Sequence, residues 1–345
     1  MSRLHLHDVA LAFRHPLVTA AGAYSTRRSV IVGFERDGVT GWGEAPTFPS
    51  GGWGTIDEAW EALSGCDPDG GSEMPLASAA LQAARRDHAA RAAAAPLFAA
   101  LGGSRRPVTA RLTVGLVGEA RDLVDRVASL VAAGAAAVKV KISPGADTGH
   151  IAAVREAFPA LAISVDANGT YPGADDPVFD ELDRLGVDLI EQPLPPGDLA
   201  GCARLRERLG ARVCIDEDIR SESDAARVIE AGAADVLSLK LMRLGYDTAL
   251  AILGRCRAAG VEVKAGGTFD TVVGRHHVLA FATLDGVVDA EAGPPAGYLI
   301  DPLGDYPGFV DGTITPLDAP GIGPGPDPQR LAAATVRSLV IGDGP

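Results

Sequence analysis

The chain has 345 residues, of which 47% are hydrophobic, so it can bury the core of a full barrel and still form a smaller second domain. Its formal net charge of −14 at pH 7 argues against nucleic acid as a partner, because affinity for a phosphate backbone comes from clustered Lys and Arg. No segment approaches the roughly 20 consecutive apolar residues of a membrane helix, so we expect no membrane partner either.

The N-terminal segment 1–13 alternates apolar and polar residues like an edge strand and lacks the continuous apolar core of a signal peptide. The cysteines have no paired short spacing, and the last three sit in helix or strand patterns that predict burial. We therefore expect reduced thiols in a cytoplasmic protein. The cysteines are Cys66, Cys202, Cys214 and Cys256.

The N-terminal part of the chain differs in pattern from the rest. Residues 29–46 predict a β-hairpin around Asp37 and Gly38, and residues 76–101 form an alanine-rich stretch typical of a long helix. These elements predict an α+β capping domain over residues 1–103, which ends in a glycine-rich boundary. The Gly- and Pro-rich segment 305–345, with one strand-like piece at 308–316, is predicted to return to this domain and complete it.

A strict alternation of strand and helix patterns occupies residues 104–304. This alternation predicts an α/β fold with a TIM-type (β/α) barrel, whose active site lies where the parallel strands end. The eight predicted strands are 110–116, 137–143, 162–169, 188–194, 213–218, 235–241, 261–267 and 287–293.

Five charged residues close five consecutive predicted strands at nearly constant spacing. They are Lys141, Asp166, Glu191, Asp216 and Lys240, separated by 25, 25, 25 and 24 residues. Side chains alternate along a strand, and the apolar neighbours of these residues have the opposite parity. All five charges are therefore predicted to point into the barrel, with two lysines flanking three carboxylates around one pocket.

Two interpretations of these inward charges are open. Barrel interiors are normally packed with branched apolar side chains, and a buried charge is costly unless it is paired or bound to a metal. The five residues can simply pair with one another at the strand ends, but their matched depth favours a metal-dependent active site. Three carboxylates without a converging His or Cys form a hard oxygen site, which favours Mg²⁺, with Mn²⁺ as a substitute.

The two lysines predict acid/base chemistry. Lys141 and Lys240 lie four strands apart in an eight-strand ring, so they approach a bound substrate from opposite sides and can remove and return one proton. Abstraction next to a carboxylate gives an enediolate, whose developing charge a divalent cation neutralises. A lysine base needs a lowered pKa, and we expect Lys139 and the metal to supply the neighbouring cations.

The site motifs resemble those of the enolase superfamily, in its muconate lactonizing enzyme subgroup. The matching elements are KVK at 139–141, DAN at 166–168, EQP at 191–193, DE at 216–217 and Lys240. The resemblance implies a modified TIM-type (β/α)7β barrel with an N-terminal capping domain, and acid/base roles for Lys141 and Lys240. The implied metal ligands are Asp166, Glu191 and Asp216, and the implied supporting residues around them are Lys139, Asn168 and Glu217.

Within that subgroup the chain is most similar to o-succinylbenzoate synthases and N-acylamino acid racemases, almost from end to end. Residues 15–34, followed by GWGEAP at 41–46, resemble their capping-domain entry, whose first loop closes over the substrate. An ordinary hairpin explains this stretch equally well. The segment GGTFDTVVGR at 266–275 resembles their seventh strand.

The departures from that group fall where the substrate is selected. Thr268 and Asp270 stand where a methionine and a glutamate are usual, and Asp218 replaces a serine, so the mechanism is better defined than the substrate. On the eighth strand, Asp289 and Glu291 resemble the paired acids with which dipeptide epimerases hold a substrate ammonium group, with a solvated acidic loop as the alternative. The expected substrate contacts are Gly267, Thr268, Asp289 and Glu291.

Other candidates receive no catalytic role. His276 and His277 begin the helix after the seventh strand and are expected to be helix-surface or packing residues. Arg27 and Arg28 can bind a distal carboxylate of the substrate, but at least one of them is expected to be an exposed charge. No Ser-His-Asp or Cys-His arrangement in a nucleophile context is visible in the sequence.

The sequence therefore predicts a Mg²⁺-dependent lyase or isomerase that forms an enediolate from a small carboxylate substrate. The reaction is either syn-dehydration, as in o-succinylbenzoate synthase, or racemisation of an N-acylamino acid. A dipeptide epimerase or a muconate-type cycloisomerase is the alternative enzyme, and a catalytically inactive binding paralogue is the alternative outside enzymes. A homo-oligomer is compatible with all of these.

Overall fold

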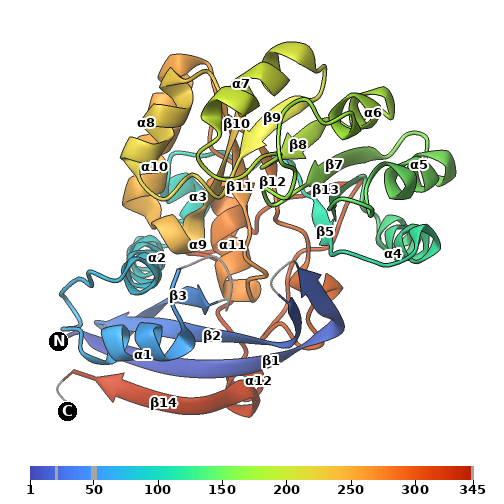
Figure 1. Ribbon diagram of the computed structural model, residues 1–345. Coiled ribbons are helices and arrows are strands. Elements are labelled where there is room, and N and C mark those ends of the chain that lie inside the picture. The colour runs from blue at the N-terminus through green and yellow to red at the C-terminus, as the bar shows by residue number, and fades with distance from the viewer. Residues whose placement is uncertain (20–21, 48–52, 343–345) are drawn as a thin grey trace.

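The computed structural model describes residues 1–19, 22–47 and 53–342. An antiparallel sheet packs on one face against two helices and on the other against a barrel of parallel strands (Figure 1). The predicted α/β fold, a TIM-type barrel with an N-terminal capping module, is confirmed. The domain boundaries at residues 103 and 304 stay a prediction.

The antiparallel sheet has the order β14-β1-β2-β3. Its strands are β1 (Arg3–Thr19), β2 (Gly22–Arg36), β3 (Val39–Thr47) and β14 (Thr335–Ile341). The predicted hairpin is confirmed, because Asp37 and Gly38 both have positive φ (52° and 76°) in the two-residue turn between β2 and β3. The C-terminal segment returns to this sheet, where Leu339 lies opposite Leu6 of β1.

Helices α1 (Ile56–Ser64) and α2 (Pro75–Ala92) pack against one face of the sheet, and α2 also contacts the barrel, where Arg86 pairs with Asp247 at 2.7 Å. A capping box starts α1: the Thr55 hydroxyl accepts from the Glu58 backbone N–H at 3.2 Å, and the Glu58 carboxylate accepts from the Thr55 N–H at 2.7 Å. The stretch 76–101 was predicted to form one long helix, but it is broken before the short α3 (Leu97–Ala100). Pro96 lacks an N–H group and so cannot continue α2.

Eight strands form the barrel, and each is parallel to its neighbours. A parallel bridge between Ala110 and Ala290 joins the first strand segment to the last and closes the ring. The strands are β5 (Leu112–Val114), β6 (Ala137–Lys141), β7 (Ala162–Asp166), β8 (Leu189–Glu191), β9 (Arg212–Ile215), β10 (Val236–Lys240), β11 (Glu262–Gly266) and β12 (Val287–Ala290).

Helices connect successive barrel strands on the outside, and β12 leads instead into the short 3₁₀ helix η1 (Pro295–Gly297). The connecting helices are α4 (Ala120–Ala132), α5 (Thr148–Ala157), α6 (Val178–Arg184), α7 (Leu199–Arg208), α8 (Glu222–Glu230), α9 (Leu241–Leu244), α10 (Tyr246–Ala259) and α11 (Val272–Phe281). Apolar side chains of the strands face these helices, as the parity predicted. Examples that are almost fully buried are Val138, Val140, Ile163, Val165 and Ile190.

Two small elements complete the chain. The predicted strand at 308–316 is only the two-residue β13 (Thr313–Ile314), and it pairs with β4 (Val108–Thr109) rather than with the capping sheet. Helix α12 (Pro328–Ala334) precedes the final strand. Its start is capped by Asp327, whose carboxylate accepts from two backbone N–H groups at 2.9 Å.

A buried glutamate fastens the capping sheet to the barrel. Glu44 on β3 accepts hydrogen bonds from the Thr271 hydroxyl at 2.7 Å and from the Gly274 backbone N–H at 3.0 Å, at the start of α11. A carboxylate is favoured there because unpaired N–H groups and the helix dipole make a helix N-terminus positive. Ser29 on β2 donates to the same carboxylate at 2.8 Å. The sheet is therefore held against the seventh barrel unit, beside the ends of the strands.

The four cysteines are buried and free, as their patterns predicted for three of them. A cytoplasmic location stays a prediction. Of the helices within the described ranges, none combines the length and the apolar character that crossing a membrane requires.

Candidate active site

The five spaced charges come together at the carboxyl ends of five adjacent strands. The register places Lys141 directly opposite Asp166, and Asp166 directly opposite Glu191. Asp216 follows the last residue of β9, and Lys240 is the last residue of β10. Parallel strands end on the same side of a barrel, so regular spacing in the sequence becomes proximity in space.

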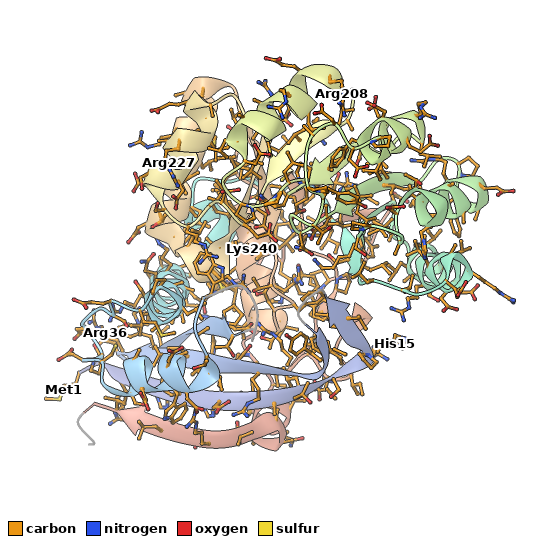
Figure 2. The ribbon with its side chains drawn as sticks, in the orientation of Figure 1. Met1, His15, Arg36, Arg208, Arg227 and Lys240 are labelled. Atoms are coloured by element: carbon orange, nitrogen blue, oxygen red, sulfur yellow. The ribbon has the colours of Figure 1, made fainter. Side chains whose placement is uncertain are left out.

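The two predicted acid/base lysines hold the carboxylates from opposite sides of the group. The Lys141 ammonium donates to the Asp166 carboxylate at 2.9 Å, and the Lys240 ammonium lies 2.7 Å from the Asp216 carboxylate. Figure 2 shows Lys240 near the centre of the molecule, between the barrel and the capping sheet. Both lysine side chains keep some exposure, 11% and 17% respectively.

Lys139 lies deeper and bridges several acids. Its ammonium is 3.1 Å from both Asp166 and Glu191 and 2.6 Å from Glu291. Its side chain is only 3% exposed. Burial disfavours the charged form, but the carboxylates outweigh this effect and raise the pKa of Lys139 well above its ordinary value. This residue is therefore a fixed cation beneath the site.

Two opposing effects act on the pKa of the Lys240 ammonium. Burial lowers this pKa, but the Asp216 carboxylate and then Glu291 more than compensate, so the pKa is raised. The ion pair with Asp216 stabilises the protonated amine more than desolvation destabilises it. The lowered pKa expected of a lysine base depends on a bound metal ion as well, so it stays a prediction.

Asn168 and Gln192 connect the strand ends to one another. Asn168, with φ of 44°, accepts from Lys141 and donates from its amide to Glu217 at 2.7 Å. The Gln192 side-chain oxygen accepts from the backbone N–H groups of Asp216 and Glu217, both at 3.0 Å. Burial, and then the charge of Asp216, raises the pKa of Glu217 to about 8. The role of Gln192 was missed, although it is the middle residue of the EQP motif.

A fourth lysine belongs to this group and was not predicted. Lys264 on β11 is fully buried, and its ammonium contacts Glu191 and lies 2.7 Å from Glu291. Two signals in the sequence point to it: its parity is opposite to that of its buried apolar neighbours, and it follows Lys240 by 24 residues, which continues the strand period. Glu291 is held by Lys139 and Lys264 together, and these cations keep its pKa well below the ordinary value despite burial.

The other expected substrate contacts are placed differently. The Thr268 hydroxyl and backbone N–H donate to Asp270, and the residue is buried. At Gly267 a β-carbon would meet the Arg275 guanidinium at 2.6 Å and the Glu291 backbone carbonyl at 3.0 Å, so a larger residue would require Arg275 to shift. Asp289 is buried and bonded to Arg111 at 2.5 Å. Its expected role in holding a substrate stays a prediction, and its carboxylate is already paired with the Arg111 guanidinium.

The remaining candidates are structural. Arg27 is fully buried and donates to the Phe269 backbone carbonyl at 3.2 Å, so it is not an exposed charge, whereas Arg28 pairs with Asp8 at 2.5 Å. His276 and His277 are buried packing residues, one of the two roles expected for them. The Asp218 carboxylate accepts from Gln192 and from the backbone of Gly197.

A cavity of about 150 Å³ lies between β1, the C-terminal half of α4 and the segments after β11 and β12. Its walls are mainly apolar, with His15 and Arg126 as basic residues. A much smaller cavity shares Thr113, Phe269 and Tyr298 with it and is also lined by Glu291. The apolar residues of the larger cavity are Phe13, Pro16, Leu17, Val114, Leu130 and Phe269. An apolar group of a ligand fits this space.

The predicted ligands of Mg²⁺ are the carboxylates at the strand ends. Across residues 1–19, 22–47 and 53–342, no three His, Cys, Asp or Glu side chains stand together as a preformed metal cluster, and the acids face lysines. The chemistry of the donors fits nonetheless. Asp166, Glu191 and Asp216 offer only hard carboxylate oxygens from adjacent strand ends, and two of these groups already share one small cation, the Lys139 ammonium.

Comparison with known proteins identifies the family to which the chain is similar. Residues 122–330 match the family model described as Enolase C-terminal domain-like. The chain is 30% identical to an o-succinylbenzoate synthase of Geobacillus stearothermophilus, over 96% of this chain and 94% of the relative. It is 37% identical to an N-succinylamino acid racemase of Thermus thermophilus, over 61% of this chain and 58% of the relative.

Solved structures agree on the fold. A member of the enolase superfamily from Listeria innocua superposes with a TM-score of 0.87 at 26% identity, covering 99% of this chain and 98% of the other. The N-succinyl Arg/Lys racemase of Bacillus cereus gives a TM-score of 0.89 at 23% identity, covering 99% of both chains. With the matched family model and the relative that spans nearly its whole length, the chain belongs to the enolase superfamily, in the muconate lactonizing enzyme subgroup.

Proposed function

We propose that this enolase-superfamily enzyme abstracts the α-proton of a carboxylate substrate through an enediolate, as an o-succinylbenzoate synthase or an N-acylamino acid racemase does. The observation that carries the proposal is the arrangement of Lys141 and Lys240, each ion-paired with a carboxylate on its own side of the site and each partly exposed. Two amines that face one space from two sides can take a proton from one face of a carbon and deliver it to the other.

The roles follow from the contacts. Asp166, Glu191 and Asp216 would hold Mg²⁺, or Mn²⁺ in its place, which supplies the positive charge that stabilises developing negative charge on the substrate carboxylate. Lys141 and Lys240 would move the proton at the α-carbon. Lys139 keeps Asp166 and Glu191 in position from below. The amide of Asn168 fixes the direction of the Lys141 ammonium, and Gln192 holds the backbone of Asp216.

The adjacent cavity supports a substrate with an apolar portion. Its aromatic and aliphatic walls suit the ring of an o-succinylbenzoate precursor or the side chain of an apolar amino acid, and Arg126 and His15 offer positive charge at its edge. Dehydration and racemisation share the first proton transfer, so both remain within one proposal. The relatives named as o-succinylbenzoate synthase and N-succinylamino acid racemase support both outcomes equally.

The test follows the α-proton directly. Purified enzyme with Mg²⁺ in D₂O is given a panel of N-succinyl and N-acyl amino acids, and exchange is followed by NMR with optical rotation in parallel. We expect exchange with racemisation for at least one apolar amino acid derivative, and loss of activity by a factor of about 10² or more in Lys141→Ala and in Lys240→Ala. Near-normal turnover in either variant would overturn the assignment of the two lysines.

Metal binding is tested separately from activity. Titration with Mn²⁺, followed by electron paramagnetic resonance, counts bound metal without any substrate. We expect one site in the wild type, and weaker binding by a factor of about 10 to 100 in Asp216→Asn, because one charged ligand is lost. Unchanged Mn²⁺ binding in that variant would show that the metal is held elsewhere.

A further inference from the structure

All lysines of this chain lie at a single site. The sequence contains 31 Lys and Arg residues, and four of these are lysines, which leaves 31 − 4 = 27 arginines. All four lysines, Lys139, Lys141, Lys240 and Lys264, contact the carboxylates at the barrel mouth. Figure 2 shows the contrast: Arg36, Arg208 and Arg227 lie at the outside of the molecule, and Lys240 lies at its centre. Lys264 is the member of this set to which the proposed reaction gives no task.

Lys264 shares a carboxylate with Lys139. Both ammonium groups approach the same Glu291 oxygen, at 2.7 and 2.6 Å, and Lys264 also contacts Glu191. The side chain of Lys264 is fully buried, whereas that of Glu291 is 9% exposed. Glu291 therefore stands between a sealed pair of cations and a more open space.

That space is a small cavity. Glu291 lines it together with Arg111 and Arg275, and the small cavity borders the larger apolar one. A carboxylate on the wall of such a cavity would ordinarily attract a cationic group of a ligand, because the charge is poorly solvated there. Here two ammonium groups already neutralise it. A third ammonium, brought in by a ligand, would meet two like charges in a region of low dielectric.

We propose that Lys264 determines substrate specificity: its ammonium takes the position on Glu291 that the free amine of a substrate would occupy, so the enzyme accepts N-acylated substrates and rejects those with a free ammonium group. The proposal rests on the proposed α-proton abstraction and narrows its substrate class. It excludes dipeptides, although Glu291 lies in a motif that resembles the ammonium-binding acids of dipeptide epimerases.

The test compares two substrates that differ in one charge. N-Succinyl-L-phenylalanine and L-alanyl-L-phenylalanine share the reacting residue, but only the dipeptide carries an ammonium group. Exchange of the phenylalanine α-proton in D₂O is measured for both at saturating Mg²⁺, and the ratio of the two kcat/KM values is the readout. A general loss of metal affinity or folded protein cancels in this ratio.

We expect the wild type to prefer the N-succinyl substrate by about 10² or more, and Lys264→Met to reduce this preference at least about tenfold by raising dipeptide turnover. Adding Glu291→Gln to Lys264→Met should remove the gain, because the released carboxylate is then absent. Lys264→Arg keeps a cation beside Glu291 and should retain the wild-type preference. If Lys264→Met leaves the ratio unchanged, Lys264 is only a structural counter-ion and the proposal is wrong.

A measurement on the unaltered enzyme keeps the proposal testable if a variant does not fold. Lysine labelled with ¹³C at the ε-carbon gives four side-chain signals, one for each lysine. N-Succinyl-L-phenylalanine should shift them in the presence of Mg²⁺, whereas the dipeptide at the same concentration should not. Shifts of equal size with both ligands would overturn the proposal. Absence of exchange with every N-acyl amino acid would instead refute the proposed function itself.

Discussion

The barrel interior contains two groups of ion pairs, at different depths along its strands. At the mouth, lysines share carboxylates: Lys139 contacts three acids, and Glu291 contacts two lysines. Nearer the amino ends of the strands, at what we call the barrel floor, Arg111 binds Asp289 at 2.5 Å and Asp188 at 2.6 Å. Each of these two acids accepts from a different N–H group of one planar guanidinium. Asp289 is buried and the Asp188 side chain is 35% exposed, and the chemistry of the two groups differs.

The choice of cation explains the difference. A guanidinium remains charged at any pH a protein meets and offers fixed donors, so it suits a permanent link between β5, β8 and β12. An ammonium group is compact, can be shared among several carboxylates and can give up a proton. Buried charge is therefore structural at the floor and reactive at the mouth. The experiments below separate the two roles.

The largest effect is expected when a lysine at the mouth is replaced by arginine, the cation found at the floor. Lys240→Arg keeps the positive charge beside Asp216 but removes an amine that can exchange its proton. We expect kcat to fall by a factor of about 10³ or more, with a melting temperature within a few degrees of the wild type. Steady-state kinetics and thermal unfolding measure the two quantities. Substantial activity in Lys240→Arg would mean that this residue acts only through its charge.

At the floor, the expected loss is in stability rather than in rate. Arg111→Met leaves the buried Asp289 without its cation, which should lower the free energy of unfolding by about 3 to 5 kcal/mol. Urea unfolding measures this loss. The folded fraction should keep its kcat, because Arg111 contacts none of the residues at the mouth that move the proton. Loss of kcat in fully folded Arg111→Met would contradict the separation of the two groups.

Mg²⁺ provides a third way to separate the two groups of ion pairs. A metal held by Asp166, Glu191 and Asp216 should stabilise the fold by about 2.7 kcal/mol at a concentration of 100 times its Kd, because it binds only the folded state. Thermal unfolding with and without EDTA measures the effect. Arg111→Met should retain the full gain, whereas Asp166→Asn should lose most of it. An equal gain in both variants would place the metal away from the mouth.

Most residues of the mouth could be predicted from the sequence, because the alternation within a strand and the spacing between strands are local patterns. A strand alternates its side chains with period two, and a barrel repeats its strands with a nearly constant period, so Lys141, Asp166 and Lys240 could be placed without knowledge of any contact. Lys264 obeyed both rules and was overlooked, because no motif draws attention to a lysine within an otherwise ordinary strand. Its level in the barrel comes from register: it lies opposite Ser238, two residues before Lys240.

The floor could not be predicted in the same way. Asp289 has the inward parity of a site residue, but its partner Arg111 precedes it by 178 residues and meets it only because the last strand closes on the first. Parity tells which way a side chain points and not which ion it will meet. For the same reason the burial of Arg27 could not be predicted, because it depends on the contact between the capping sheet and the segment around Phe269.

Acid titration sharpens the comparison, because a buried histidine belongs to neither group. Burial lowers the pKa of His276 to about 4, below the ordinary value of 6.5. Its contribution to stability is complete above pH 6.5 and is lost as the pH falls towards 4, since only the unfolded chain then binds the proton. Between pH 7 and pH 5 this predicts a loss of about 2 kcal/mol.

Urea unfolding at several pH values tests the histidine. His276→Phe should lack this loss of about 2 kcal/mol relative to the wild type, while the lowered pKa of His277 gives a slope in the same direction and the raised pKa of Glu217 a slope in the opposite direction in both proteins. Arg111→Met should show the wild-type slope, because a guanidinium does not titrate in this range. A slope that is unchanged in His276→Phe would assign the acid sensitivity to the carboxylates of the mouth.

The smallest effect is expected for an arginine pair that matches the floor in distance and differs in burial. Arg227 lies 2.5 Å from Asp224 on the outer helix α8, the same separation as Arg111 and Asp289, but its side chain is 68% exposed against 4% for Arg111. Solvent screens the exposed pair and hydrates each charge when the other is removed, so Arg227→Met should change the free energy of unfolding by less than about 0.5 kcal/mol. Urea unfolding of the two Arg→Met variants side by side measures the difference. Equal losses of stability would show that the distance between the ions sets their contribution. A much larger loss in Arg111→Met would show that the contribution comes from the cost of leaving a buried carboxylate without its cation.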